Sequence, residues 1–330
     1  MIKFEMLDDG DEWNRVVRAS PYGTVFHTFE WMDVLEQQYK VQKIPLGIFE
    51  NGDLIGVFPA FLQRKGIFNI LVSPLHEAAT PYAGPVVGNN KLSDVIRAFD
   101  IYSECADYYD ITFSPGYVYD DNVLENLDFQ ERYTYILNLD QSIDIIWKNL
   151  NKKCRNAIRK AKKSDVTIVE GNSQRDLEDF WEMIEVTFQK WDTESPISVD
   201  YTRAVYDAFS QNEQFKMIFA ERDGERIGGA IFLCFADKIY YWQGASYPDY
   251  YRYAPNNLIQ WHIIQWAVQN GFRIYDMLGA NIPSIAKFKS SFGGDLVSYS
   301  YLYKSHSSLA DAGRGAYVWW RKNVKRDLYR

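Results

Sequence analysis

The chain has few of the residues that build disulfide frameworks or metal sites. Its 330 residues include three cysteines and four histidines, and no Cys-x-x-Cys pair occurs. The small number and wide separation of these cysteines and histidines exclude a zinc finger and a disulfide-stapled fold, and they predict no metal site. We therefore expect a protein of a reducing compartment, the cytoplasm.

Long hydrophobic runs and several signature motifs are also absent. No apolar segment approaches the ~20 residues that cross a bilayer, and the acidic start MIKFEMLDDGDEW is not of the signal-peptide type. There is no P-loop, no dinucleotide-binding GxGxxG, no GxSxG elbow and no catalytic Cys-His signature. These absences predict a chain without a membrane span and exclude the corresponding enzyme classes.

Positive charge is in the minority, with 36 basic against 44 acidic residues and a formal net charge of −8. This balance argues against DNA binding by the whole surface but leaves room for a local basic groove. Hydrophobic residues make up 47% of the chain and aromatic residues 16%, so disorder is excluded. The length predicts two domains.

The chain contains an internal repeat. The segments IFENGDLIGVFPAFL (48–62) and IFAERDGERIGGAIFL (218–233) each predict a strand, a tight turn and a second strand. Their turns carry Asn51-Gly52 and Asp223-Gly224, which are strong hairpin signals because a type I′ turn needs positive φ at both central residues. Two unrelated hairpins with common turn chemistry are the alternative.

A second pair of landmarks favours duplication. After each hairpin, an apolar-striped helix (from 92 and from 256) precedes a strand that carries Tyr109-Asp110 or Tyr275-Asp276. The turn glycines lie 172 residues apart and the Tyr-Asp pairs 166 apart (224 − 52 and 275 − 109). Nearly equal offsets predict two copies of one α+β unit.

The elements between and after the hairpins follow from periodicity. One helix is expected from an N-cap at Asp140 or Ser142 to about Lys163, with an apolar face. Further elements are expected at 177–190 and 200–209 (helices), at 216–221, 227–235 and 238–244 (strands), and at 308–330 (a basic helix).

This order of elements, met twice, resembles the FemAB family of tandem GNAT-type acyltransferases, including its shorter members. The matching motifs are, in chain order, FHTFEWMDVL (26–35), TPYAGPVVG (80–88), LNKKCRNAIRKAKK (150–163), YYWQGAS (240–246), PNNLIQW (255–261) and YDMLG with FKSSFGG (275–279 and 288–294). The resemblance implies an α+β fold of two GNAT-like domains with mixed central sheets flanked by helices. We place them at 1–140 and 141–307, with the helix 308–330 packing back on the first and the active site in the second.

The resemblance also implies an enzyme, an acyltransferase or aminoacyltransferase that acts on an amine of a small or nucleotide-linked acceptor. The donor would be an aminoacyl-tRNA or an acyl-CoA, used as a co-substrate, with no tightly bound cofactor and with tRNA as a partner. A CoA-dependent N-acetyltransferase of an amino sugar or amino acid in cell-envelope biosynthesis is one alternative. A non-catalytic module for an anionic sugar or peptide is another, and we expect a monomer in each case.

Two departures from the family pattern bear on the acceptor. No charged heptad stretch provides the long helical arm of larger members. Peptidoglycan-building members tend to carry a lysine shortly after the N-terminal Trp, whereas Trp31 is followed by Met-Asp-Val-Leu. The second departure weakens the case for a cell-wall precursor.

Lys289 is the first candidate catalytic residue. Attack of an amine on an ester or thioester places negative charge on the carbonyl oxygen, which a positioned cation stabilises. The resemblance places the family's functional lysine here, after the end of a strand, with Phe288 and Phe292 as apolar walls and Gly293 and Gly294 allowing close backbone approach. The alternative is a surface lysine on a short helix, as expected for Lys287.

Asp276 is the second candidate, because it ends the apolar strand before this loop. It could orient the amine or accept its proton. Alternatively it is structural, capping the 280–284 segment or pairing with Lys289, and Asp110 would hold the same place in the first half. His76-Glu77 could be a catalytic pair but is interpreted as structural.

Residues Arg252, Asn256 and Asn257 occupy the place where CoA-binding GNAT proteins carry a glycine-rich turn. The arginine is present and both glycines are replaced. Arg252 could contact a phosphate or be a solvated loop residue, and Asn256 or Asn257 is expected to cap the next helix and fill the phosphate pocket. This departure disfavours tight CoA binding.

Two further sets complete the candidate substrate-binding residues. Residues 148–163 contain eight basic side chains and no acidic one, and Arg155 and Arg159 share a helical face that would suit phosphates unless it is merely solvated. Tyr240 and Trp242 alternate on one face of a strand. One face of this strand packs in the core and the other could line the acceptor site, with Tyr240 the first candidate.

Overall fold

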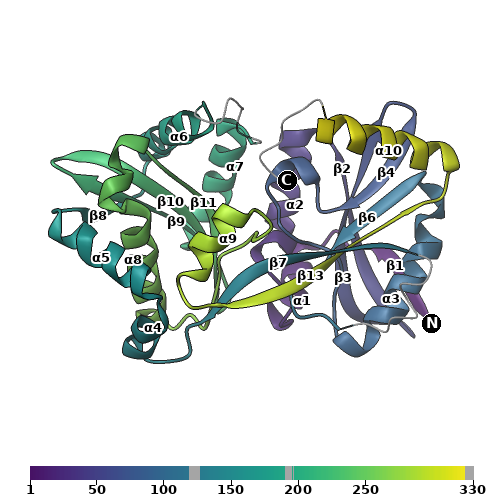
Figure 1. The fold of residues 1–330 in the computed structure, drawn as a ribbon. Coiled ribbons are helices and arrows are strands. Elements are labelled where there is room, and N and C mark those ends of the chain that lie inside the picture. Colours follow the sequence, from purple (N-terminus) through teal and green to yellow (C-terminus); the bar gives the residue numbers. More distant parts are fainter. Residues whose placement is uncertain (119–126, 190–194, 196, 324–330) are drawn as a thin grey trace. The chain divides into compact units, whose positions relative to one another are not determined.

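The computed structural model describes residues 1–118, 127–189, 195 and 197–323 (Figure 1). Residue contacts divide it into two compact units. The first comprises Met1–Arg132 and the described residues from Ser298 onward, and the second comprises Tyr133–Val297. We expected domain boundaries after residues 140 and 307, whereas the two units divide after Arg132 and after Val297.

The first unit is built on a mixed sheet. In spatial order its strands are β1 (Ile2–Met6), β2 (Gln42–Glu50), β3 (Asp53–Lys65), β4 (Phe68–Ser73), β6 (Tyr108–Thr112) and β13 (Asp295–Ser305). Neighbours are antiparallel except β4 and β6, which run parallel. A short strand, β5 (Val86–Val87), pairs with β3.

Helices cover both faces of this sheet (Figure 1). The helix α3 (Asn89–Tyr102) packs on one face, where its apolar side chains join those of β2, β3 and β6 in a continuous core. The helices α1 (Gly10–Ala19) and α2 (Phe29–Tyr39) contact β3 and β2. The remaining helical elements are η1 (Val25–His27), η2 (His76–Ala78), η3 (Ser103–Cys105) and α10 (Ser308–Asn323).

The second unit repeats this plan. Its strands, in the order from one edge, are β8 (Thr167–Gly171), β9 (Phe215–Arg222), β10 (Glu225–Phe235), β11 (Lys238–Ser246), β12 (Ile274–Asp276) and β7 (Asp128–Asn138). Neighbours are again antiparallel except one pair, β11 and β12. The helices are α4 (Ile143–Asn149), α5 (Lys152–Lys163), α6 (Gln174–Gln189), α7 (Val199–Phe209), α8 (Pro255–Gln269), α9 (Pro283–Ser290), η5 (Ser210–Asn212) and η6 (Pro248–Tyr253).

The duplication predicted from the sequence is confirmed by these two equivalent sheets. Both hairpin turns have positive φ at both central residues: 54° and 96° at Asn51-Gly52, and 54° and 81° at Asp223-Gly224. The two Tyr-Asp pairs lie on β6 and β12. In the first unit β6 pairs in parallel with β4, and in the second unit β12 pairs in parallel with β11.

The closing strand of each sheet comes from a distant part of the chain. In the first unit, β6 pairs with Tyr301–Ser305 of β13, which follows the entire second repeat in sequence. In the second unit, β12 pairs with residues 136–138 of β7, which precede that repeat. Antiparallel addition at the edge of β6 and β12 satisfies backbone groups that would otherwise be exposed.

The predicted helix from 140 to 163 is two helices, so that prediction is wrong. The Ser142 side chain caps α4, which ends at Asn149, and the Asn151 side chain caps α5 by accepting from the Cys154 N–H at 2.7 Å. A second N-cap side chain competes successfully with helix continuation. The predicted apolar face is confirmed, since Cys154, Ile158 and Ala161 are buried against α8 and the sheet.

No helix in the described ranges combines the length and hydrophobicity needed to span a bilayer. The same residues contain no cluster of three His, Cys, Asp or Glu side chains placed to hold a metal ion.

Candidate functional site

The candidate site forms around the turn that follows β12. This strand is short and buried, and it ends in Asp276, whose side chain is 4% exposed. One carboxylate oxygen accepts hydrogen bonds from the Thr134 hydroxyl at 2.6 Å and from the Leu278 N–H at 2.8 Å. The hydrogen bond from the Leu278 N–H stabilises a turn in which the backbone is left-handed, with φ of 53° at Leu278 and 23° at Gly279.

Lys289 reaches the same turn from α9. Proline at the first helical position starts α9, and Lys289 lies in its last turn, only 7% exposed. Its ammonium donates to the Leu278 carbonyl and to the Gly279 carbonyl, the latter at 2.9 Å. The alternative of a surface lysine is therefore wrong for Lys289, whereas Lys287 is exposed as expected.

Burial controls the electrostatics of this ammonium. Removal from water lowers the pKa of Lys289 to about 8, and the negative charge of Asp276 keeps it from falling further. The Lys289 Nζ also lies 5.6 Å from the centroid of the Tyr241 ring, within the range of a cation–π contact. The site thus holds an ammonium that loses its proton at a lower pH than an exposed lysine does.

The aromatic neighbour of Lys289 is not one that the sequence singled out. Tyr240 and Trp242 are both buried, and Trp242 packs edge-to-face on Tyr201 of α7 at 5.9 Å. The intervening residue, Tyr241, projects from the other face of β11, toward Lys289. Side-chain alternation along a strand places Tyr241 and Tyr240 on opposite faces of β11. The neighbouring residues in the sequence do not indicate which of these two faces lies toward Lys289.

A buried polar pair also escaped the sequence analysis. The Tyr275 hydroxyl donates to the Gln260 side-chain oxygen of α8, and both residues are at most 1% exposed. A glutamine among the apolar residues of a buried helix was the available signal, because buried amides require partners.

The residues flanking Lys289 pack within the unit. Phe288 is half-buried and meets the fully buried Phe292 edge-to-face at 5.2 Å. A Cβ at Gly293 would lie 2.6 Å from the Asn149 carbonyl oxygen, and one at Gly294 would lie 2.9 Å from the Ile136 carbonyl oxygen. Both glycines therefore allow close approach of neighbouring backbone from the chain itself, and their approach to a substrate stays a prediction.

The start of α8 differs from the prediction. Neither Asn256 nor Asn257 caps the helix, because the N-cap position is Ala254 and no side chain accepts from the first turn. Asn256 donates to the Ser246 hydroxyl at 3.1 Å, and Asn257 donates to the Cys154 sulfur at 3.6 Å. The prediction failed because Ala254 adopts a left-handed conformation, φ 55°, so that the helix begins at Pro255.

The three candidate arginines occupy different environments. Arg252 is exposed and stacks over Tyr253 at 4.8 Å, and Arg222 lies over the same ring at 4.3 Å. Arg155 donates to the Lys148 carbonyl at 2.8 Å and to the Leu150 carbonyl, and so closes the end of α4. Arg159 is exposed on α5. Arg155 thus has a structural contact, and the other two present charge to solvent.

In the first unit, His76 pairs with Asp110 rather than with Glu77. The His76 Nε2 lies 2.8 Å from the Asp110 carboxylate, whereas Glu77 binds Lys65 at 2.7 Å. Asp110 is 2% exposed and occupies on β6 the place that Asp276 has on β12. The two carboxylates therefore share a position in the fold but have different partners.

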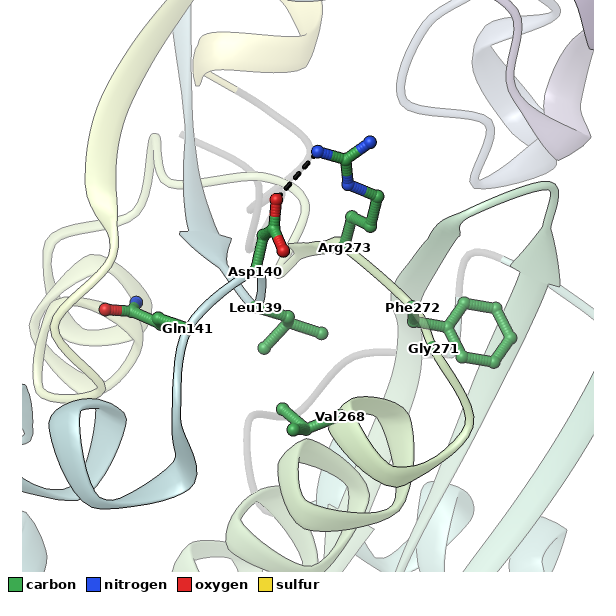
Figure 2. Close-up of a pocket in the computed structure, with 7 residues that line it drawn as sticks. All are labelled: Leu139, Asp140, Gln141, Val268, Gly271, Phe272 and Arg273. Atoms are coloured by element: carbon green, nitrogen blue, oxygen red, sulfur yellow. Dashed lines mark hydrogen bonds and ion pairs between the residues drawn. The ribbon is translucent and has the colours of Figure 1, made fainter.

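One pocket of the second unit lies away from Lys289. It has a volume of about 350 Å³, and an ion pair of 2.7 Å joins Arg273 and Asp140 at its wall (Figure 2). Its lining residues are Leu139, Asp140, Gln141, Val268, Gly271, Phe272 and Arg273. Arg273 precedes β12 and Asp276 ends it, so this pocket is at the opposite end of the strand from the candidate site.

Comparisons with known proteins agree with this architecture. Residues 148–290 match a family model described as an acetyltransferase (GNAT) domain. The UDP-N-acetylmuramoylpentapeptide-lysine N(6)-alanyltransferase of Weissella viridescens is 23% identical over 299 residues, covering 83% of this chain and 85% of the relative.

Two solved structures share the fold. The crystal structure of FemX has a TM-score of 0.73 and 15% identity, covering 90% of this chain and 96% of its own. A tandem GNAT protein from the clavulanic acid biosynthesis pathway has a TM-score of 0.54 and 9% identity, covering 93% and 99%. The predicted resemblance to the FemAB family, the tandem GNAT fold and the enzyme class, an acyltransferase, are thereby confirmed.

Proposed function

We propose that the protein transfers an aminoacyl group from an aminoacyl-tRNA to an amine of a nucleotide-linked acceptor in cell-envelope biosynthesis. The observation that carries the proposal is the buried ammonium of Lys289 at the turn after β12. The similarity to an enzyme named for alanyl transfer to a lysine amine supports the aminoacyl donor and the amine acceptor.

The reaction is an exchange of an ester bond for an amide bond. The acceptor amine attacks the aminoacyl carbonyl carbon, a C–N bond forms and the C–O bond to the ribose breaks. The amine loses one proton and the departing ribose oxygen gains one. In the transition state negative charge develops on the carbonyl oxygen and on the leaving oxygen, where a fixed cation contributes most.

Lys289 is suited to stabilise that charge. Two of its N–H groups donate to the Leu278 and Gly279 carbonyls, which fixes the direction of the ammonium. Within the ranges that the structure describes, the third N–H donates to no protein group, and we assign it to the substrate oxygen. A cation with only 7% exposure acts in low dielectric, so its interaction with a new negative charge is strong.

Asp276 is best assigned as a positioning residue. The Asp276 carboxylate accepts from the N–H of Leu278, and the carbonyl of Leu278 accepts from the Lys289 ammonium. The negative charge of Asp276 also favours the protonated form of Lys289. These contacts support the structural alternative over direct proton transfer to Asp276.

A CoA-dependent N-acetyltransferase is the second candidate. No side chain caps the N-terminus of α8, so the fold provides no side-chain acceptor for the N–H groups of its first turn, which a phosphate could supply. Arg252 stands immediately before this turn. Both features favour a CoA pyrophosphate at this place more than the sequence suggested.

Turnover assays with purified protein separate these readings. The donors are aminoacyl-tRNA and acetyl-CoA, each with UDP-linked peptide acceptors and with amino sugars. We expect turnover with aminoacyl-tRNA, and a Lys289→Ala loss of about 10²–10³ in kcat, the usual effect of removing one oxyanion donor. The matched control is Lys287→Ala, on the same helix but exposed, which should retain the wild-type rate.

Three results would contradict the proposal. Turnover with acetyl-CoA alone would favour the second candidate, and full activity of Lys289→Ala would remove the lysine from the chemistry. Saturable binding of an anionic sugar or peptide without turnover for any donor would identify a binding module.

A further inference from the structure

The solvent side of α5 carries a dense cluster of positive charge. The helix buries Cys154, Ile158 and Ala161, and Figure 1 shows it alongside α8. Its opposite side exposes six cations: Lys152, Lys153, Arg159, Lys160, Lys162 and Lys163. The sequence from 148 to 163 contains no acidic residue, although acids outnumber bases in the chain as a whole.

These charges are not neutralised by the fold. In the described part of the chain, none of the α5 cations forms an ion pair. Other cations of the same unit are paired: Lys216 with Glu170 at 2.6 Å, and Arg226 with Asp179 at 2.8 Å. Like charges three or four residues apart repel one another, so this helix carries a cost that a bound polyanion would offset.

The charge continues beyond the C-terminal end of α5. Arg222 donates from Nε to the carbonyl of Ser164, the residue that ends the helix, at 3.0 Å. Arg222 and Arg252 both stack on Tyr253, and η6, which contains Arg252 and Tyr253, contacts α5. We call the six α5 cations with Arg222 and Arg252 the basic strip.

The other end of α5 adjoins the Lys289 segment. The N–H of Asn151, the α5 N-cap, donates to the Ser291 carbonyl at 3.0 Å, two residues after Lys289. The twelve residues of α5 extend about 18 Å from this junction, at about 1.5 Å per residue. A ligand along the strip would therefore have one end close to the candidate site.

We propose that the basic strip binds the phosphate backbone of the tRNA donor, along its acceptor stem. This inference rests on the proposed aminoacyl-tRNA donor. The eight cations of the strip, six of them on α5, exceed what a single pyrophosphate of CoA or of a nucleotide-linked acceptor can neutralise, whereas an RNA stem presents a phosphate at every nucleotide. The apolar residues of α5 face the core, so the helix has nothing to insert into a lipid surface.

The first test measures binding of a synthetic RNA hairpin, shaped as a tRNA acceptor stem with a CCA end, by fluorescence anisotropy over a range of salt. We expect Lys153→Glu/Lys160→Glu to weaken binding about tenfold or more and to reduce the slope of log K against log salt by about 2. The matched control is Lys3→Glu/Arg64→Glu, which changes two exposed basic residues of the first unit by the same charge.

Equal affinity and equal salt slope in the strip variant and the control would overturn the inference. So would loss of binding to phosphatidylglycerol vesicles with retained RNA affinity, which would assign the strip to a membrane surface.

The second test separates the strip from the chemistry. The donors are full-length aminoacyl-tRNA and an aminoacylated CCA trinucleotide, which is too short to follow α5. We expect Lys153→Glu/Lys160→Glu to lower kcat/KM about tenfold more for the full-length donor than for the trinucleotide. Equal losses with both donors would refute the strip while leaving the transferase proposal intact, and no turnover of either donor by the wild-type protein would refute the transferase proposal itself.

Discussion

Asp276 and Lys289 bind the two polar groups of one residue, Leu278: the carboxylate accepts from its N–H and the ammonium donates to its carbonyl. Leu278 has a φ of 53°, a conformation that costs a non-glycine residue free energy unless its surroundings hold it. The turn, the carboxylate and the ammonium therefore form one unit, in which each group fixes the position of the next.

The first prediction concerns the charge of Asp276. An Asp276→Asn variant keeps an oxygen that can accept from Leu278 and Thr134 but removes the negative charge. The pKa of Lys289 should then fall below about 8, because Asp276 is what raises it. The high-pH limb of kcat, where the ammonium loses its proton, should move to lower pH, and a pH–rate profile measures this.

The equivalent change in the first unit, Asp110→Asn, is the control for Asp276→Asn and should leave the limb in place. An unchanged limb in both variants would mean that Asp276 does not tune Lys289. Asp276→Ala, which also removes the hydrogen bonds, should lower the free energy of unfolding by about 1–3 kcal/mol.

The second prediction concerns stability against pH. Lys289 has a folded-state pKa of about 8, lowered from 10.5. Between these values the unfolded chain holds a proton that the folded chain has released, so stability rises with pH by about 1.4 kcal/mol per unit. The free energy of unfolding of the wild type minus that of Lys289→Met should increase by about 3 kcal/mol from pH 8 to pH 10.5.

Urea unfolding at about pH 7, 8, 9 and 10.5 gives this difference for Lys289→Met directly. The two backbone carbonyls that the variant leaves without Lys289 add an offset that does not depend on pH. The same comparison with Lys287→Met should be flat. A flat difference for Lys289→Met as well would show that the lysine is not buried in solution.

The third prediction concerns the fit between Gly244 and Tyr241 on β11. A Cβ at Gly244 would lie 2.0 Å from the Tyr241 hydroxyl oxygen. Gly244→Ala must therefore displace the ring that faces Lys289, and it should destabilise the unit by about 1–3 kcal/mol. Removing the hydroxyl with Tyr241→Phe should relieve part of this cost, with a coupling energy of about 1 kcal/mol in a double-mutant cycle. Additive effects would show that the ring moves aside freely.

The fourth prediction concerns Gly293, where the Lys289 segment meets the end of α4. Gly293 has a φ of +79° and no room for a Cβ beside the Asn149 carbonyl, whereas Gly271 has a φ of +78° and open space. Gly271→Ala should cost about 1–2 kcal/mol from backbone conformation alone. Gly293→Ala should cost about 1–3 kcal/mol more, because of the clash.

Thermal or urea unfolding of the Gly293→Ala and Gly271→Ala variants compares the two costs. Similar losses would mean that the junction between α4 and the Lys289 segment is loose. That result would also weaken the link between α5 and the candidate site.

Short-range features were predictable from the sequence. The hairpins at Asn51-Gly52 and Asp223-Gly224, the strands around them and the apolar face of α5 all follow from a few neighbouring residues. Turn chemistry and side-chain periodicity act over that range, so one pattern leads to one structure. The repeat of these local signals was sufficient to identify a duplicated α+β unit.

The two predictions that failed concern where a helix begins, which also depends on neighbouring residues. At each of these places the chain had two possible conformations. The chain between Ser142 and Lys163 could continue as one helix or restart at Asn151, and α8 could begin at an asparagine cap or at Pro255. At the first site the Asn151 side chain caps a new helix, and at the second the left-handed Ala254 precedes a helix that begins at Pro255. Propensity differences of less than about 1 kcal/mol are easily overridden by tertiary context.

The site depends on contacts between distant parts of the chain. Lys289 and Asp276 were visible in the sequence, but the burial that lowers the lysine pKa, the Tyr241 ring beside it and the Thr134 hydroxyl on the carboxylate each come from a different strand or helix. The pairing of β7 with β12 and of β13 with β6 joins residues more than a hundred positions apart. Composition and local pattern therefore specified which elements form and where the charge lies, whereas the electrostatics of the site came from desolvation and long-range pairing, which exist only once those elements have packed together.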